Sequence, residues 1–184
     1  MKGEIMEEYG QKIMDSDDQY QCRRVRRQYL SLVLKIVLLI AAGWLILTKV
    51  FLITQATGQG MFPAVKDGDL LIVYRMQKDY QKNDIVTYQK NGERFTGRIV
   101  AIGTDMVNMD ENGKLYINGG PEAGEILFPT YPAGELNYPY HVPKGCVYVL
   151  GDYRTQTEDS REFGVIAEDD LEGKVISLLR RRNL

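Results

Sequence analysis

The sequence predicts a mainly β domain carried on a single N-terminal transmembrane helix. The first observation is one apolar run, Tyr29 to Thr54, in a chain of otherwise ordinary composition, with 44% hydrophobic and 26% charged residues. The second is a series of short β-branched runs after residue 55, separated by turn signals such as Asn-Gly and Asp-Gly. No helical periodicity of comparable length follows the apolar run.

The apolar run is long enough to cross a bilayer. Its charge-free centre, residues 36–48, has only 13 residues. The boundary residues Lys35 and Lys49 have long stems that can raise their ammonium groups toward the headgroups, which extends the span to about 20 residues. The alternative is a buried core helix of a soluble protein. It is disfavoured because nothing else in the chain would cover a helix that is apolar on every face.

Four arginines directly precede the span, at positions 23, 24, 26 and 27. By the positive-inside tendency these arginines stay in the cytoplasm. We therefore expect a single-pass protein of the plasma membrane with a cytoplasmic tail over residues 1–28, partly helical at best. After this tail we expect a transmembrane helix over residues 29–54 and then an extracellular domain over residues 55–184. Cys22 and Cys146 would then lie on opposite sides of the membrane and could not pair.

Composition excludes two kinds of function. A formal net charge of -2 gives the molecule no general attraction to nucleic acid. One histidine and two cysteines cannot build a metal site of the usual kind, so we expect neither a metal nor another cofactor.

The domain after residue 55 is expected to consist of short strands and turns. Asn91-Gly92 between two β-branched runs predicts a hairpin. The proline-rich stretch from Gly119 to Gly145, called the excursion below, predicts an irregular and exposed segment. The expected strands are Leu70–Tyr74, Ile85–Tyr88, Arg98–Ile102, Leu115–Ile117, Cys146–Leu150 and Val175–Leu179.

Distinctive segments stand in order along this domain at residues 57–65, 95–105, 115–119 and 149–164. Three of them contain the motifs Gly58-Gln59-Gly60-Met61-Phe62-Pro63, Thr96-Gly97-Arg98-Ile99-Val100 and Gly151-Asp152-Tyr153-Arg154-Thr155-Gln156-Thr157-Glu158-Asp159-Ser160-Arg161. Their order and spacing after a membrane anchor resemble type I signal peptidases of Gram-positive bacteria, over residues 30–184. The resemblance implies the antiparallel β fold of those serine endopeptidases.

The resemblance also implies that the catalytic pair is missing. In that family a serine before Met-x-Pro is the nucleophile, and a lysine before the arginine of the second motif is the general base. Gly60 and Gly97 occupy these two positions. Cleavage by this route needs both an oxygen nucleophile and a base, and glycine supplies neither. Arg98 cannot act as the base, because the pKa of a guanidinium lies above about 12.

The remaining motif residues are assigned by the resemblance to the groove and its framework. Gly58 allows a close backbone approach beside the nucleophile position. Thr157 matches a family serine that orients the lysine. Asp159 and Arg161 are most simply a buried charge pair in a hydrogen-bonded turn. The complete set is Gly58, Met61, Phe62, Pro63, Arg98, Asp152, Arg154, Thr157, Asp159, Ser160 and Arg161.

Three functions stay open at this point. The first is a catalytically inactive protein whose groove binds an extended apolar segment by strand addition. The resemblance extends to signal-peptidase-like proteins of Gram-positive pilus gene clusters, which implies chaperone-like assistance in pilus assembly, with a pilin or pilus sortase as partner. The second is an active signal peptidase with a relocated nucleophile such as Thr96 or Thr157. The third is a membrane-anchored interaction module that uses the excursion.

Overall fold

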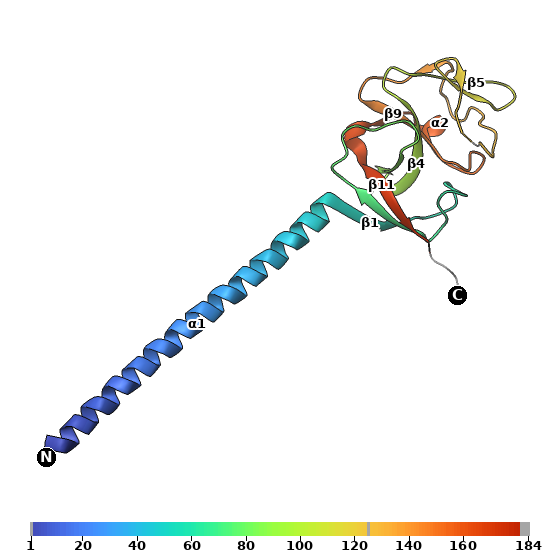
Figure 1. The fold of residues 1–184 in the computed structure, drawn as a ribbon. Helices are drawn as coiled ribbons and strands as arrows, with labels where there is room; N and C mark the ends of the chain where they lie inside the picture. Colours follow the sequence, from blue (N-terminus) through green and yellow to red (C-terminus); the bar gives the residue numbers. More distant parts are fainter. Residues whose placement is uncertain (1, 125, 181–184) are drawn as a thin grey trace. The chain divides into compact units, whose positions relative to one another are not determined.

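The computed structural model describes residues 2–124 and 126–180, with side chains from residue 24 onward. The chain divides into two compact units, residues 1–47 and 48–184. The first is helical and the second is built of β-strands (Figure 1).

The helical unit belongs to α1, Lys2–Val50. Within α1, residues 24–50 are long and apolar enough to cross a membrane, so the predicted apolar N-terminal helix is confirmed. The expected boundaries differ at both ends. The first 28 residues are helical from Lys2 rather than partly helical, because they contain no proline and many good helix formers. The helix ends at Val50 rather than Thr54, because Phe51–Gln55 forms strand β1 and pairs with β2.

The β unit is centred on an antiparallel sheet of seven strands in the order β1-β2-β11-β3-β4-β9-β10. The last strand of the chain, β11, therefore lies between β2 and β3. The bounds are β2 Leu70–Tyr74, β3 Ile85–Lys90, β4 Glu93–Ile102, β9 Cys146–Leu150, β10 Ile166–Ala167 and β11 Leu171–Leu179.

The predicted hairpin at Asn91-Gly92 is confirmed between β3 and β4. Lys90 pairs with Glu93, so the loop has two residues. Asn91 and Gly92 have φ values of 53° and 84°. Positive φ at both central residues is typical of the type I′ turn that joins twisted antiparallel strands.

A second antiparallel sheet has the order β7-β6-β5-β8. Its outer strands, β7 and β8, are the two ends of the excursion, and most of the stretch between them has no regular structure, as predicted. Two short helices complete the unit, α2 Ser160–Phe163 and the 3-10 helix η1 Glu168–Asp170. The strand bounds are β5 Met106–Met109, β6 Leu115–Ile117, β7 Gly120–Pro121 and β8 Tyr140–His141.

Apolar clusters fix the motif-bearing segments to these sheets. Met61 and Val65, from the loop after β1, pack with Leu71 and Val73 of β2. On another part of the seven-stranded sheet, Tyr88 of β3 packs in a cluster with residues of β4 and β9. The first motif is thus attached to β2, whereas the second lies on β4.

Asp105 organises the turn that connects β4 to β5. Its carboxylate accepts hydrogen bonds from Ile102 N at 2.9 Å and Asn118 Nδ2 at 2.6 Å, and lies 3.0 Å from Lys82 Nζ. Burial raises the pKa of Asp105, but the hydrogen bonds and the Lys82 charge outweigh it, so the pKa lies below its ordinary value.

Because the pKa of Asp105 is lowered in the folded state, part of the free energy of unfolding should depend on pH. The stabilisation is present above about pH 4 and is lost as the pH falls through the lower pKa of the folded state. We expect Asp105→Asn to lower the unfolding temperature at pH 7 and to weaken its decline toward pH 3. Asp169→Asn, at an exposed position, is the control. If Asp105→Asn and the parent protein show parallel profiles in thermal scans from pH 7 to pH 3, the prediction fails.

Candidate functional site

The three sequence motifs come together around one cavity of about 340 Å³, called the groove below. The loop after β1 contributes residues 58–61, β4 contributes residues 93–96, and the loop after β9 contributes residues 156–159. The fold thus brings together segments that lie about a hundred residues apart in the sequence. Among the residues that line the groove there is no lysine and no histidine.

One wall of the groove is an unpaired strand edge. β3 pairs with β4 along residues 93–98, whereas β9 pairs with β4 only from Arg98 onward. In the part of the chain that the structure describes, no strand pairs with the other edge of residues 93–97. Backbone N–H and C=O groups on such an edge can accept an added strand.

Neither Gly60 nor Gly97 could carry a Cβ atom without a shift of the side chain that packs on it. A Cβ atom at Gly60 would lie 2.6 Å from Thr157 Cγ2, and one at Gly97 would lie 2.4 Å from Val149 Cγ1. Both distances are far shorter than a normal carbon–carbon contact. Neither glycine has a φ in the left-handed region, so the turn geometry does not require glycine at either position. Methyl groups of neighbouring residues fill the space instead.

The Thr157 side chain is held by hydrogen bonds that aim its methyl group at Gly60. Its hydroxyl donates to Asp159 Oδ2 at 3.0 Å, and Arg161 Nη2 lies 3.3 Å from the same hydroxyl. The methyl group also covers Gly151, where an added Cβ would lie 2.3 Å from Thr157 Cγ2. The hydroxyl therefore donates to a buried carboxylate and accepts from the Arg161 guanidinium, which cannot take up its proton.

Asp159 and Arg161 form the predicted buried pair. Asp159 is 1% exposed and Arg161 is 4% exposed. The Asp159 carboxylate accepts from Arg161 Nε at 2.8 Å and Nη2 at 2.9 Å, and from the backbone N of Gly151 at 3.2 Å. Burial lowers the pKa of Arg161, but the hydrogen bond and charge of Asp159 raise it above its ordinary value. Ser160 Oγ accepts from Val149 N at 3.0 Å and so braces β9.

Other predicted framework residues lie outside the groove. Arg98 donates to Asp152 through Nε at 2.8 Å and Nη2 at 2.7 Å. The hydrogen bond to Asp152 raises the pKa of Arg98, and burial opposes it. Arg154 binds Glu122 of the excursion. These four residues, together with Pro63, line a second cavity.

The two residues after Gly60 lie in different surroundings. Met61 is 4% exposed and lines the groove from the core side, whereas Phe62 is 39% exposed and does not line it. The Phe62 ring packs on Tyr153 with centroids 6.3 Å apart. Gly58 lines the groove with a φ of 79°, and its N–H donates to Asp67 Oδ1 at 2.8 Å.

Two residues important for this site were not identified from the sequence. Val149, which fills the space beside Gly97, begins the last of the distinctive segments but was assigned no role in the site. Glu122, which pairs with Arg154 across 32 positions of sequence, lies in no motif and carries no local signal.

Comparison with known proteins identifies the family. A family model described as "Signal peptidase, peptidase S26" matches residues 27–179. The chain belongs to the peptidase S26 family. Signal peptidase IB of Staphylococcus aureus (strain COL) is 31% identical over 167 residues, covering 78% of this chain and 87% of that protein. Signal peptidase I of Bacillus caldolyticus is 30% identical over 134 residues, covering 64% and 73%.

A crystal structure of a signal peptidase I from Enterococcus faecalis V583 covers 54% of this S26 chain and 98% of its own, with 28% sequence identity and a TM-score of 0.43. The family match confirms the predicted family. The observed elements confirm the predicted mainly β fold with one N-terminal apolar helix. That helix is consistent with membrane anchoring. The orientation in the membrane and the roles assigned to Gly60 and Gly97 stay predictions.

Proposed function

We propose that this chain is a catalytically inactive signal-peptidase-like membrane protein that holds an extended segment in the groove without cutting it. The main support for this proposal is the pair of residues Gly60 and Gly97. Neither residue supplies a nucleophile or a base, and Thr157 and Val149 fill the space beside them. Loss of such a catalytic unit in serine hydrolases lowers turnover by about a million-fold.

Binding does not depend on the missing side chains. The free edge of residues 93–97 on β4 offers backbone hydrogen bonds to an extended segment. Phe95, which is partly buried, adds apolar surface to the lining of the groove. An extended segment with small or apolar side chains therefore suits the groove, and its binding survives the loss of the nucleophile.

We further propose that the protein gives chaperone-like assistance in assembling surface pili of Gram-positive bacteria. The support is the resemblance to signal-peptidase-like proteins of pilus gene clusters, which names a pilin or a pilus sortase as the source of the segment. In this proposal residues 1–28 are cytoplasmic, a membrane helix ends at Val50, and the β unit is extracellular. The groove then faces the compartment in which pilins are joined.

An active signal peptidase is the second candidate, favoured by the names of the relatives. It requires a relocated nucleophile and base. Thr157 donates its hydroxyl proton to Asp159, and Thr96 has no lysine or histidine near it in the lining of the groove. The charged side chains that do line the groove are Glu93, Arg94, Glu158 and Asp159.

Cleavage and binding of a labelled preprotein separate the two candidates. We expect the full-length protein in liposomes to release no cleaved product on a gel, while an active signal peptidase in the same liposomes cuts. We expect the uncut preprotein to bind, because binding uses the strand edge. Cleavage that disappears in Thr96→Val or Thr157→Val would establish the second candidate.

A matched pair of variants tests the location of binding. Thr96→Arg places a bulky cation in the groove and is expected to weaken preprotein binding at least about tenfold. Thr155→Arg introduces the same charge at an exposed position outside the groove and should leave binding unchanged. Equal binding by both variants in a flotation assay would contradict the groove as the binding site.

A further inference from the structure

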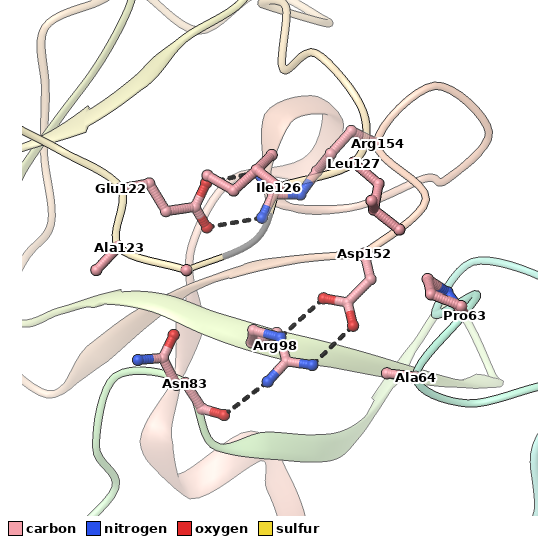
Figure 2. Close-up of a pocket in the computed structure, with 11 residues that line it drawn as sticks. Pro63, Ala64, Asn83, Arg98, Glu122, Ala123, Ile126, Leu127, Asp152 and Arg154 are labelled. Carbon is pink, nitrogen blue, oxygen red and sulfur yellow. Dashed lines mark hydrogen bonds and ion pairs between the residues drawn. The ribbon is translucent and has the colours of Figure 1, made fainter.

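A second cavity, of about 370 Å³, lies between the excursion and the main sheet. Figure 2 shows two arginine–carboxylate pairs in it, Arg98 with Asp152 and Arg154 with Glu122. Ile126 and Leu127, from the excursion, are 41% and 54% exposed and also line it.

The arginines in this cavity have little capacity left for an anion. Arg98 donates twice to Asp152 and once to Asn83 O at 3.1 Å. Arg154 donates to Glu122 at 2.7 and 3.0 Å, to Thr130 Oγ1 at 2.7 Å and to Gly151 O at 2.7 Å. Each guanidinium is neutralised by its own carboxylate, and a ligand anion would have to displace that carboxylate. The uncharged part of the lining includes the exposed aliphatic side chains of Ile126 and Leu127.

The cavity continues the groove along the same three segments of chain. On β4, Thr96 lines the groove and Arg98 lines the cavity, so only Gly97 separates them. Their side chains lie on the same face of the strand, about 7 Å apart. The loop after β1 likewise contributes Gly60 to the groove and Pro63 to the cavity.

The loop after β9 likewise lines both the groove and the cavity. It contributes Thr157 to the groove and Asp152 to the cavity. The two hollows therefore adjoin the pair of glycines, and an extended chain advances about 7 Å in two residues. A segment in the groove reaches the cavity within a few residues of passing the glycines.

We propose that the cavity is the second half of the binding groove and receives an aliphatic side chain of the same extended segment, a few residues beyond the glycine pair. The proposal rests on the proposed function. A peptidase must release the downstream half of its substrate after each cut. A protein that holds its segment uncut gains affinity from both halves at once.

The test uses the full-length protein in detergent micelles and fluorescent 12-residue peptides. The parent peptide alternates alanine and threonine, and each variant peptide carries one leucine at a different position. We expect one or two neighbouring leucine positions to tighten binding about tenfold in fluorescence anisotropy. Leu127→Asp should abolish this gain. Ile176→Asp, at a position 53% exposed and outside both cavities, should retain the gain.

The outcomes distinguish this proposal from the proposed function. If the parent peptide binds but no leucine position tightens binding, the second half-site is wrong and the groove stands. The same conclusion follows if Leu127→Asp retains the gain. If the parent peptide does not bind at all, both proposals are overturned.

Discussion

Replacing Asp159 by asparagine is expected to lower the free energy of unfolding of the β unit by about 3–5 kcal/mol. The side chain keeps its size but loses its charge, and Arg161, which is 4% exposed, is left buried without a counter-ion. The same carboxylate accepts hydrogen bonds from the Thr157 hydroxyl and the Gly151 N–H. The substitution therefore disturbs the charge pair and the floor of the groove together.

Urea unfolding of the full-length protein in detergent, followed by tyrosine near-UV circular dichroism, measures this loss. Glu158→Gln is the matched control, because Glu158 is the neighbouring residue but is exposed. We expect it to change stability by less than about 0.5 kcal/mol. A loss of similar size in both variants would show that the Asp159–Arg161 pair does not hold this loop.

Introducing the serine and lysine that the resemblance implies for positions 60 and 97 is expected to destabilise the protein rather than to create a peptidase. Gly60→Ser and Gly97→Lys each force a new Cβ into a methyl group, at 2.6 Å and 2.4 Å. Overpacking of this kind costs about 1–3 kcal/mol. The larger loss is expected at Gly97, because Val149 is fully buried in β9 and the lysine also brings an ammonium group toward the core.

Removal of the opposing methyl groups should relieve this loss. Thr157→Ser deletes the Cγ2 that faces Gly60, and Val149→Ala deletes the Cγ1 that faces Gly97. In double-mutant cycles each pair should show a favourable coupling of about 1 kcal/mol or more, measured by urea unfolding. Cleavage of a preprotein is expected only from the fourfold variant. Strictly additive stabilities would mean that the glycine positions are not sterically closed.

The sequence predicted the main elements because their signals are local. The β-branched runs at Leu70–Tyr74 and Cys146–Leu150 became β2 and β9 with the same bounds. β1 was missed because Phe51–Gln55 continues the apolar run of α1, and hydropathy does not show where a helix ends and a strand begins. The placement of β11 between β2 and β3 depends on long-range pairing, for which a single sequence holds no local signal.

The sequence predicted which residues belong to the candidate site, but not how their side chains pack. The motifs identified Gly60, Gly97 and the Asp159–Arg161 pair. The closure beside Gly97 depends on the register of β4 with β9, which includes an irregularity between Ile99 and Ala101. Register of this kind is set by the whole sheet rather than by neighbouring residues, so the sequence alone does not predict the contact with Val149.

The central position of β11 sets the order in which the protein can mature. Until residues 171–179 leave the ribosome, β2 and β3 each have an open edge. The loop with Gly60 is packed on the β2 side through Met61, while β4 belongs to the β3 side. The two walls of the groove therefore join only after residues 171–179 have been made. A nascent chain that lacks residues 171–179 therefore has no complete groove.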